Sequence, residues 1–187
     1  MARFLLGIIL GVLFVPIAAL LWLRSDKAPV AVADPPLPYE RDITGMLLHQ
    51  RIDRELVQIP PIQPNEANFV AGAHIYNEKC SFCHGFHGKT SDIGSNMYPD
   101  APSLWEKHRG NDAVGVSDDP PGETYWKVFN GIRLTGMPSY RTQLSGNEIW
   151  QVTLLLANAN KPLPPAALQI LRGGPAPAAA AIAPDEK

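Results

Sequence analysis

Two cysteines and a histidine stand together near the middle of the chain, in residues 80–84, with the sequence CSFCH. Cys80 and Cys83 are the only two cysteines, so they do not form a disulfide framework, which needs more pairs closing longer loops. A redox dithiol would need a βαβ context, which the sequence does not show. A zinc site would need two more nearby ligands, for which only His84 and His87 are candidates. We therefore favour covalent haem attachment over these and over a chance match, because two thiols at this spacing can bond to one haem and the adjacent imidazole of His84 can bind its iron.

A second axial ligand to the iron must come from elsewhere in the chain. Met137 is the best candidate, because it precedes Pro138 and is therefore kept out of helical conformation. It follows His84 by 53 residues, which is enough chain to wrap a haem. Its thioether is a soft, neutral donor suited to iron(II). The alternatives are Met97, which follows His84 by only 13 residues, or a second histidine from the following set: His74, His87 and His108.

Composition excludes some classes of protein. The 187 residues include 16 Lys and Arg against 18 Asp and Glu, a net charge of −2. Such a balance does not favour a nucleic-acid partner, which needs excess positive charge to contact phosphates. Proline makes up 19 residues, about twice the usual ~5%. Most of the prolines flank a middle region, which indicates one globular domain of roughly 95 residues.

The apolar periodicity predicts an all-α domain, since no segment alternates convincingly with period two. A helix should begin at Asn65 or Asn68 and run toward Cys80. Ser145 and Glu148 form a capping-box pattern at the start of the last helix. The expected helices are residues 41–57, about 66–80, 123–130 and 148–159, with a short turn near 104–107.

The first segment is apolar throughout. Residues 4–23 carry no charged or polar side chain, and Trp22 and Arg24 suit the membrane interface. Twenty helical residues span ~30 Å, the thickness of the hydrocarbon core of a bilayer. We expect a single transmembrane anchor in the lipid bilayer. A cleaved secretory signal is the alternative, since residues 31–33 (AVA) resemble a cleavage site, and a buried helix of a soluble protein is a third.

These patterns divide the chain into four expected segments. They are residues 1–24 as transmembrane anchor or signal sequence, 25–64 as a Pro-rich linker with a short amphipathic helix, 65–162 as the haem domain, and 163–187 as an Ala/Pro-rich disordered tail.

Residues 66–160 resemble the class I cytochrome c family, and the resemblance covers about half of the chain. Gly72 and Tyr76 lie eight and four residues before Cys80, as a glycine and an aromatic do in the family's first helix. Further similar motifs are Ala101–Leu104 (APSL), Asn130–Arg133 (NGIR), Thr135–Pro138 (TGMP), Leu144–Ser145 and Ile149–Trp150. One departure is Leu155, where the family usually has an aromatic that contacts the first helix.

The resemblance implies a cytochrome c fold with one covalent haem c on Cys80 and Cys83, and with His84 and Met137 on the iron. The expected residues of the apolar haem crevice are Tyr76, Pro102, Leu104 and Trp126.

We expect an electron carrier rather than an enzyme, passing single electrons between respiratory or periplasmic redox proteins. The alternative is a non-catalytic haem subunit of a multi-subunit dehydrogenase or oxidase. A haem enzyme or gas sensor would need an open coordination position on the iron, and ligation by Met137 would fill that position. The family's haem attachment in bacteria is completed outside the cytoplasm, so we expect an inner-membrane protein with its haem domain on the periplasmic side.

Overall fold

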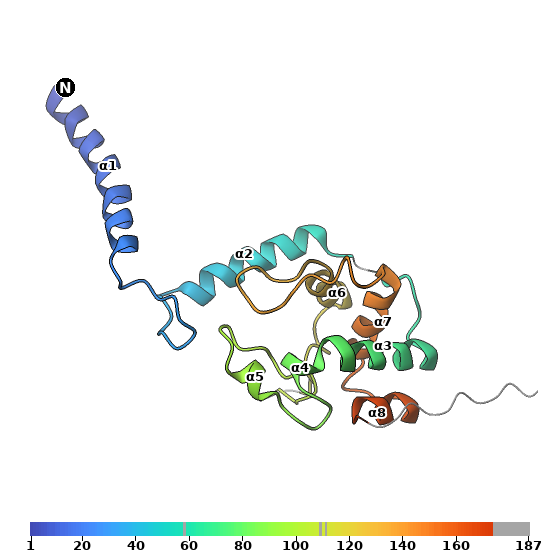
Figure 1. Cartoon of the computed structure of the whole chain (residues 1–187). Helices are drawn as coiled ribbons and strands as arrows, with labels where there is room; N and C mark the ends of the chain where they lie inside the picture. Colours follow the sequence, from blue (N-terminus) through green and yellow to red (C-terminus); the bar gives the residue numbers. More distant parts are fainter. Residues whose placement is uncertain (58, 109, 111, 174–187) are drawn as a thin grey trace, which may run out of the picture. The chain divides into compact units, whose positions relative to one another are not determined.

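The computed structural model describes residues 1–57, 59–108, 110 and 112–173 (Figure 1). Among these residues every regular element is a helix, and β-structure is limited to two isolated bridges, Phe86 with Lys89 and Lys107 with Val114. The prediction of an all-α fold is confirmed. The chain divides into two compact units, Met1–Thr44 and Gly45–Lys187.

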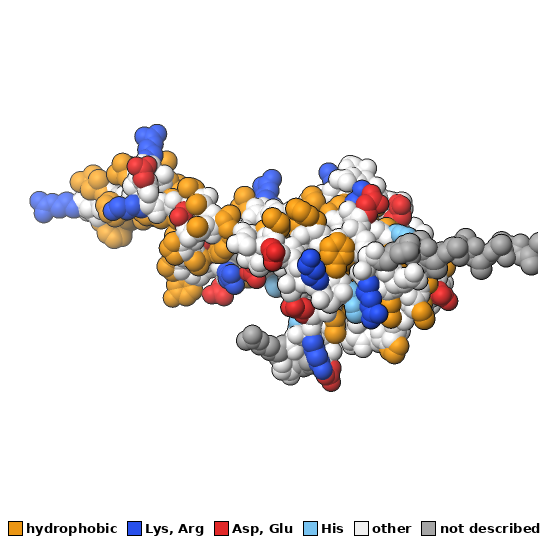
Figure 2. Space-filling model, turned by 60° about the horizontal axis from the view of Figure 1, so that its bottom comes forward, with side chains coloured by type: hydrophobic (Ala, Val, Ile, Leu, Met, Phe, Trp, Pro, Cys, Tyr) orange, Lys and Arg blue, Asp and Glu red, His pale blue; other side chains and the backbone are white. Residues whose placement is uncertain are grey.

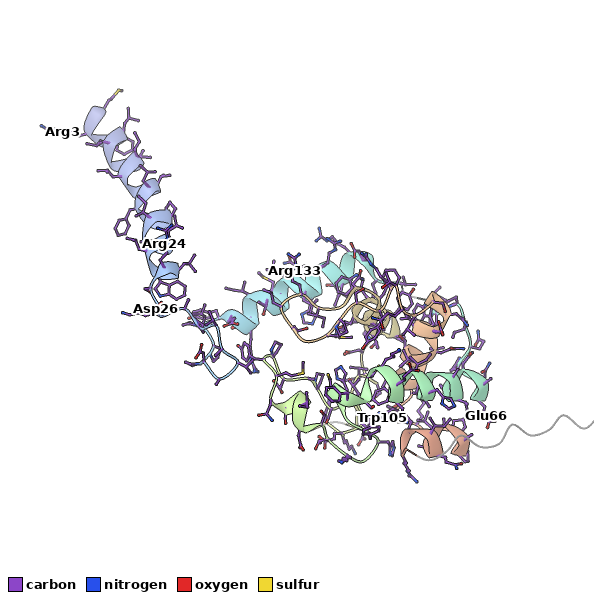
Figure 3. All side chains as sticks on the ribbon, in the orientation of Figure 1. Arg3, Arg24, Asp26, Glu66, Trp105 and Arg133 are labelled. Atoms are coloured by element: carbon purple, nitrogen blue, oxygen red, sulfur yellow. The ribbon has the colours of Figure 1, made fainter. Side chains whose placement is uncertain are left out.

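The first unit contains helix α1, Ala2–Arg24. Residues Arg3–Arg24 have a mean hydropathy of 2.9, and none of this segment is buried. Arg3 and Arg24 lie at the two ends of this apolar helix (Figure 3). By length and composition α1 is a candidate transmembrane helix, and a signal sequence would have the same properties. Helix α2, Glu40–Glu55, begins in this unit and ends in the second one.

The core of the second unit is the pair formed by α3, Glu66–Lys79, and α7, Gly146–Ala157. The two backbones come close at Gly72, where a Cβ would lie 2.5 Å from the carbonyl oxygen of Gln151 and 3.2 Å from the Leu155 Cβ. Leu155 is fully buried and stands at this contact between the two helices. A small residue at position 72 is therefore required by packing rather than by backbone conformation.

Both core helices begin at the caps that the sequence predicts. The Asn65 side chain accepts a hydrogen bond from the Asn68 backbone N–H at 2.9 Å. Ser145 and Glu148 form a complete capping box at the start of α7. These bonds satisfy backbone donors that have no partner inside a helix.

Three further helices lie beside the core pair, and one of them carries Cys83 and His84. Helix α6, Pro121–Asn130, packs on α7, and the Tyr125 ring stacks on the Trp150 ring with centroids 4.3 Å apart. The short helices α4, Ser81–His84, and α5, Asp92–Ser95, follow α3 and contact each other.

Helix α8, Pro165–Leu171, corrects the expected boundary of the tail. The composition of residues 163–187 predicts a disordered tail apart from a turn at Leu168–Leu171, but α8 is a full helix that packs against α3 with Ala167, Ile170 and Leu171 buried. These three residues recur at the spacing of one helix face, and Pro165 stands in the first turn, where proline is tolerated. The high Ala and Pro content concealed this pattern. Residues 174–187, the remainder of the predicted tail, lie outside the described residues.

Candidate haem-binding site

A cavity of about 130 Å³, partly open to solvent, lies in the second unit. The lining is mainly apolar and comes from three segments, residues 79–84, 97–102 and 128–140. The cavity brings together five of the predicted site residues, Cys80, Cys83, His84, Pro102 and Met137, and it also contains Met97, the alternative axial ligand.

The two cysteines lie on one helical turn. Cys80 ends α3 and precedes α4, and its carbonyl accepts hydrogen bonds from the backbone N–H groups of Cys83 at 3.2 Å and His84 at 2.9 Å. Neither thiol is in a disulfide. Burial, with a smaller contribution from the charge of Cys83, raises the pKa of the Cys80 thiol to about 12. Both thiols are thus held beside the cavity, and Cys80 stays protonated at neutral pH.

The imidazole of His84 is fixed by one hydrogen bond. Its Nδ1 lies 2.8 Å from the carbonyl oxygen of Pro102. A carbonyl only accepts, so Nδ1 carries the proton and the Nε2 lone pair is left for a metal. Burial lowers the pKa of His84, and the bond to Pro102 opposes that shift. The neutral form, which can ligate iron, is therefore the favoured one.

Met137 lies at the end of a loop closed by its own hydrogen bonds. The Met137 N–H donates to the Thr135 hydroxyl at 3.1 Å, and the Met137 carbonyl accepts from the Ile132 N–H at 3.2 Å. The Thr135 hydroxyl donates to the Ile132 carbonyl at 2.7 Å. Gly131 opens the loop at φ 70°, a conformation that favours glycine, and packs against the backbone of Pro138. This ring of bonds holds the methionine in place beside the cavity.

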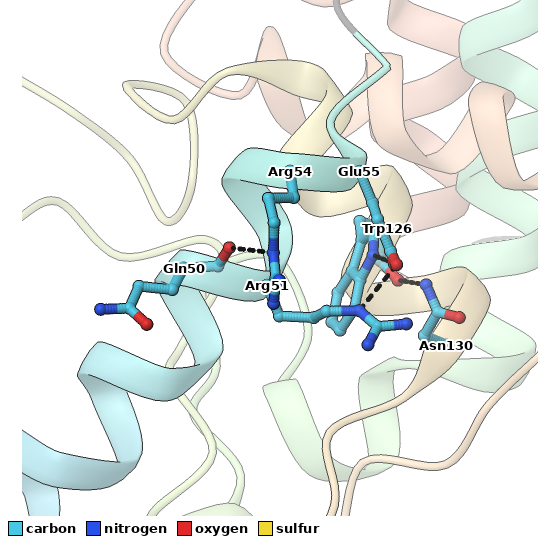
Figure 4. A network of polar contacts seen from close by, with 6 residues as sticks. All are labelled: Gln50, Arg51, Arg54, Glu55, Trp126 and Asn130. Atoms are coloured by element: carbon cyan, nitrogen blue, oxygen red, sulfur yellow. Dashed lines mark hydrogen bonds and ion pairs between the residues drawn. The ribbon is translucent and has the colours of Figure 1, made fainter.

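The other three predicted crevice residues lie away from the cavity lining. Tyr76 and Leu104 are buried in the hydrophobic core, and the Tyr76 hydroxyl donates to the Gly85 carbonyl at 2.7 Å. This bond fixes the end of α4, so Tyr76 supports the cysteine segment from behind. The indole N–H of Trp126 donates instead to the Glu55 carboxylate at 2.8 Å (Figure 4). Trp126 also lines a separate hollow.

Some cavity residues are not predicted from the sequence. They include Lys79, Val128 and Tyr140. The Tyr140 hydroxyl donates to the Lys79 carbonyl at 2.7 Å, which ties the loop after Met137 to the end of α3. These residues are of common types and belong to no motif, so no spacing rule could have selected them.

One comparison with known proteins matches the part of the chain that holds the cavity. Residues 67–155 match the family described as cytochrome c oxidase, cbb3-type, subunit III. This part of the chain is a c-type cytochrome domain. Helices α3 to α7 therefore form a cytochrome c fold, and the cofactor implied by the family is haem c with its iron.

Two other comparisons give no further evidence on the function. No curated protein matches the sequence. One solved structure, a chain of the reducing HAO-like protein complex of Kuenenia stuttgartiensis, is 25% identical. The match covers 53% of this chain and 46% of that chain, with a TM-score of 0.40.

The cavity of the cytochrome domain suits a haem c by its donor set. Two thiols, one imidazole with a free Nε2 and two thioethers, those of Met97 and Met137, line the same mainly apolar space. Softer sulfur and imidazole donors suit iron, and apolar walls limit the access of water. The residues present therefore fit the cofactor that the family implies.

Proposed function

We propose that this protein is a membrane-anchored c-type cytochrome that carries single electrons between redox proteins. The observation that supports it most directly is the single cavity shared by Cys80, Cys83, His84 and Met137. When bound, a haem c supplies a one-electron Fe(III)/Fe(II) couple. Because the chain has only one pair of thiols, we expect one haem, bonded covalently to Cys80 and Cys83.

His84 and Met137 are the proposed axial ligands. The bond to Pro102 orients the imidazole, and the hydrogen-bonded loop around Thr135 holds the thioether. Methionine ligation favours iron(II) and raises the reduction potential. With both axial positions filled, no position remains for a substrate. The remaining function is electron transfer without catalysis.

Docking with redox partners should depend only weakly on salt. Residues 66–160 contain seven Lys and Arg and ten Asp and Glu, a net charge of −3. Figure 2 shows charged side chains of both signs interspersed on the visible face. Steering by one broad positive face is therefore not expected, and a small, mainly apolar contact is the better hypothesis.

The proposed location is the bacterial inner membrane, with the cytochrome domain on the periplasmic side. Helix α1 supports an anchor by its length and hydropathy. A tether raises the local concentration of the domain near membrane partners, so weak contacts can sustain electron transfer. The protein should stay in membranes through a high-salt, high-pH wash. A released form beginning at Asp34 would instead indicate a cleaved signal.

A second candidate function is a non-catalytic haem subunit of an oxidase or dehydrogenase. The description of the matched family, which names an oxidase subunit, favours it. Ile43, Met46 and Leu47 of α2 are also more than half exposed and could contact another subunit. Purification from gently solubilised membranes separates the two functions, because a stable stoichiometric partner is expected only for the subunit.

Haem attachment is tested by extracting the denatured protein with acidified solvent. Haem should remain on the polypeptide, and Cys80→Ser combined with Cys83→Ser should abolish this retention. Met137→Ala should lose the methionine–iron absorption band and bind carbon monoxide in the reduced state, because one axial position opens. Met46→Ala is the matched control, since Met46 lies on α2 away from the cavity lining. An intact methionine–iron band in Met137→Ala would refute the proposed ligand.

A further inference from the structure

The segment from Gly94 to Pro102 is fastened at both ends to the turn that carries the cysteines and His84. At one end, a Cβ on Gly94 would overlap the carbonyl oxygen of Cys83, so the two backbones are in direct contact. At the other end, the Pro102 carbonyl accepts the hydrogen bond from His84. The segment and the cysteine turn therefore form one side of the cavity, which we call the His84 wall.

Met97 lies in the middle of this segment, and its side chain reaches the loop before Met137 on the other side of the cavity. A Cβ at Gly136 would overlap the Met97 methyl group, and both residues line the cavity. Gly136 is exposed and Met97 is partly exposed, which places their contact at the solvent edge of the cavity. Gly136 has no positive φ, so its backbone does not require glycine. The space taken by Met97 is what requires a glycine beside Met137.

We propose that Met97 is a positioning residue that closes the rim of the haem cavity and holds the Met137 loop against the His84 wall. The inference rests on the proposed His84 and Met137 ligation. Met97 itself is not an iron ligand in this proposal. Its flexible thioether side chain fills the gap between the two walls and keeps water and small ligands away from the Met137 side.

The consequence is a difference in how easily an external ligand displaces Met137. With the rim closed, a competing ligand must both replace the thioether and break the contact between Met97 and Gly136. Removing that contact raises the free energy of the closed loop relative to an open one, so displacement of Met137 becomes easier. The iron ligands stay the same, so the spectrum of the resting protein should not change.

The test is imidazole binding to the oxidised full-length protein in detergent. Met97→Ala should raise the apparent affinity about fivefold or more, with the methionine–iron band intact before imidazole is added. Met97→Leu, which conserves volume, should stay close to the wild type. Gly136→Ala should also raise the affinity, because its methyl group displaces only the flexible end of Met97. Gly45→Ala, with open space around it, is the control.

Three other outcomes would overturn the proposal, each in a distinct way. An unchanged affinity in Met97→Ala means that the contact does not hold the loop. A rise in Met97→Ala but not in Gly136→Ala means that Met97 acts elsewhere. Loss of the methionine–iron band in Met97→Ala would make Met97 the ligand, which contradicts the proposed function as well. Loss of the band only in Met137→Ala leaves the proposed function standing whatever imidazole shows.

Discussion

Two regions of the second unit use a glycine to bring backbones together, but they differ in what surrounds it. Gly72 joins α3 to α7 inside the hydrophobic core, next to the fully buried Leu155. Gly122 of α6 contacts the backbone of Val57, which follows α2. A Cβ on Gly122 would overlap the Val57 carbonyl oxygen. In α2 only Ile52 is buried. The first contact is part of the core, whereas the second fastens a segment outside the matched cytochrome domain.

This difference predicts how much each contact contributes to the free energy of unfolding. A core contact gains from apolar burial on every side, and it cannot relax without opening the core. The contact at Gly122 has solvent nearby and can relax by releasing a segment. Substitutions in the two regions should therefore differ in how much they lower the free energy of unfolding and in whether they affect the haem cavity.

Gly72→Ala should have the largest effect. The new methyl group would meet the Gln151 backbone, which cannot rotate away, so α3 and α7 must separate. We expect the free energy of unfolding to fall by about 3 kcal/mol, as for overpacked cores. Urea denaturation of the full chain in detergent, followed by circular dichroism, measures this change.

Gly45→Ala is the matched control for that substitution. Gly45 lies inside α2 with no atom within 4 Å of a new Cβ. Alanine is a better helix former than glycine by about 0.5–1 kcal/mol, so stability should stay level or rise. Equal destabilisation by the two substitutions would contradict the contrast between the core and the α2 segment.

Gly122→Ala should have an intermediate effect, about 1–2 kcal/mol. The methyl group would push Val57 and Leu56 away from α6 and loosen the end of α2. Trypsin should then cleave faster after Arg51 and Arg54, while the haem spectrum stays unchanged. A changed spectrum together with slow cleavage would mean that α6, rather than the linker, had moved.

The same contrast explains which features could be predicted from the sequence. The Asn65 cap and the capping box at Ser145 depend on neighbours in the chain, and the structure has both. The cysteine turn and Met137 followed from local spacing and chemistry, and the cavity brings them together. Local patterns such as these can be interpreted residue by residue.

Contacts between distant segments could not be predicted in this way. Trp126 was assigned to the haem crevice because it is aromatic, but its indole N–H is bonded to Glu55, 71 residues earlier. The contact of Met97 with Gly136 joins two loops, and α8 is buried only because α3 lies beneath it. In each case the decisive partner comes from the tertiary fold, which a spacing pattern does not contain.

The hydrogen bond between Trp126 and Glu55 should contribute least. Glu55 also pairs with Arg51 at 2.7 Å, and both side chains of that pair are at least 40% exposed (Figure 4). Solvent screens such contacts, so each contributes about 0.2–1 kcal/mol. We expect Trp126→Phe and Glu55→Ala to show a coupling free energy of about 0.5 kcal/mol in a double-mutant cycle.

The size of that coupling separates two ways of holding α2. If the glycine contact at Gly122 and the burial of Ile52 hold the segment, removing the Glu55 carboxylate leaves tryptic cleavage nearly as slow as in the wild type. Arg51→Gln is the companion variant, because it removes the exposed ion pair and keeps the bond to Trp126. A coupling above about 2 kcal/mol would exceed the range for exposed contacts. The polar bond would then be what attaches α2, and the ranking of the Gly122 contact above it would be wrong.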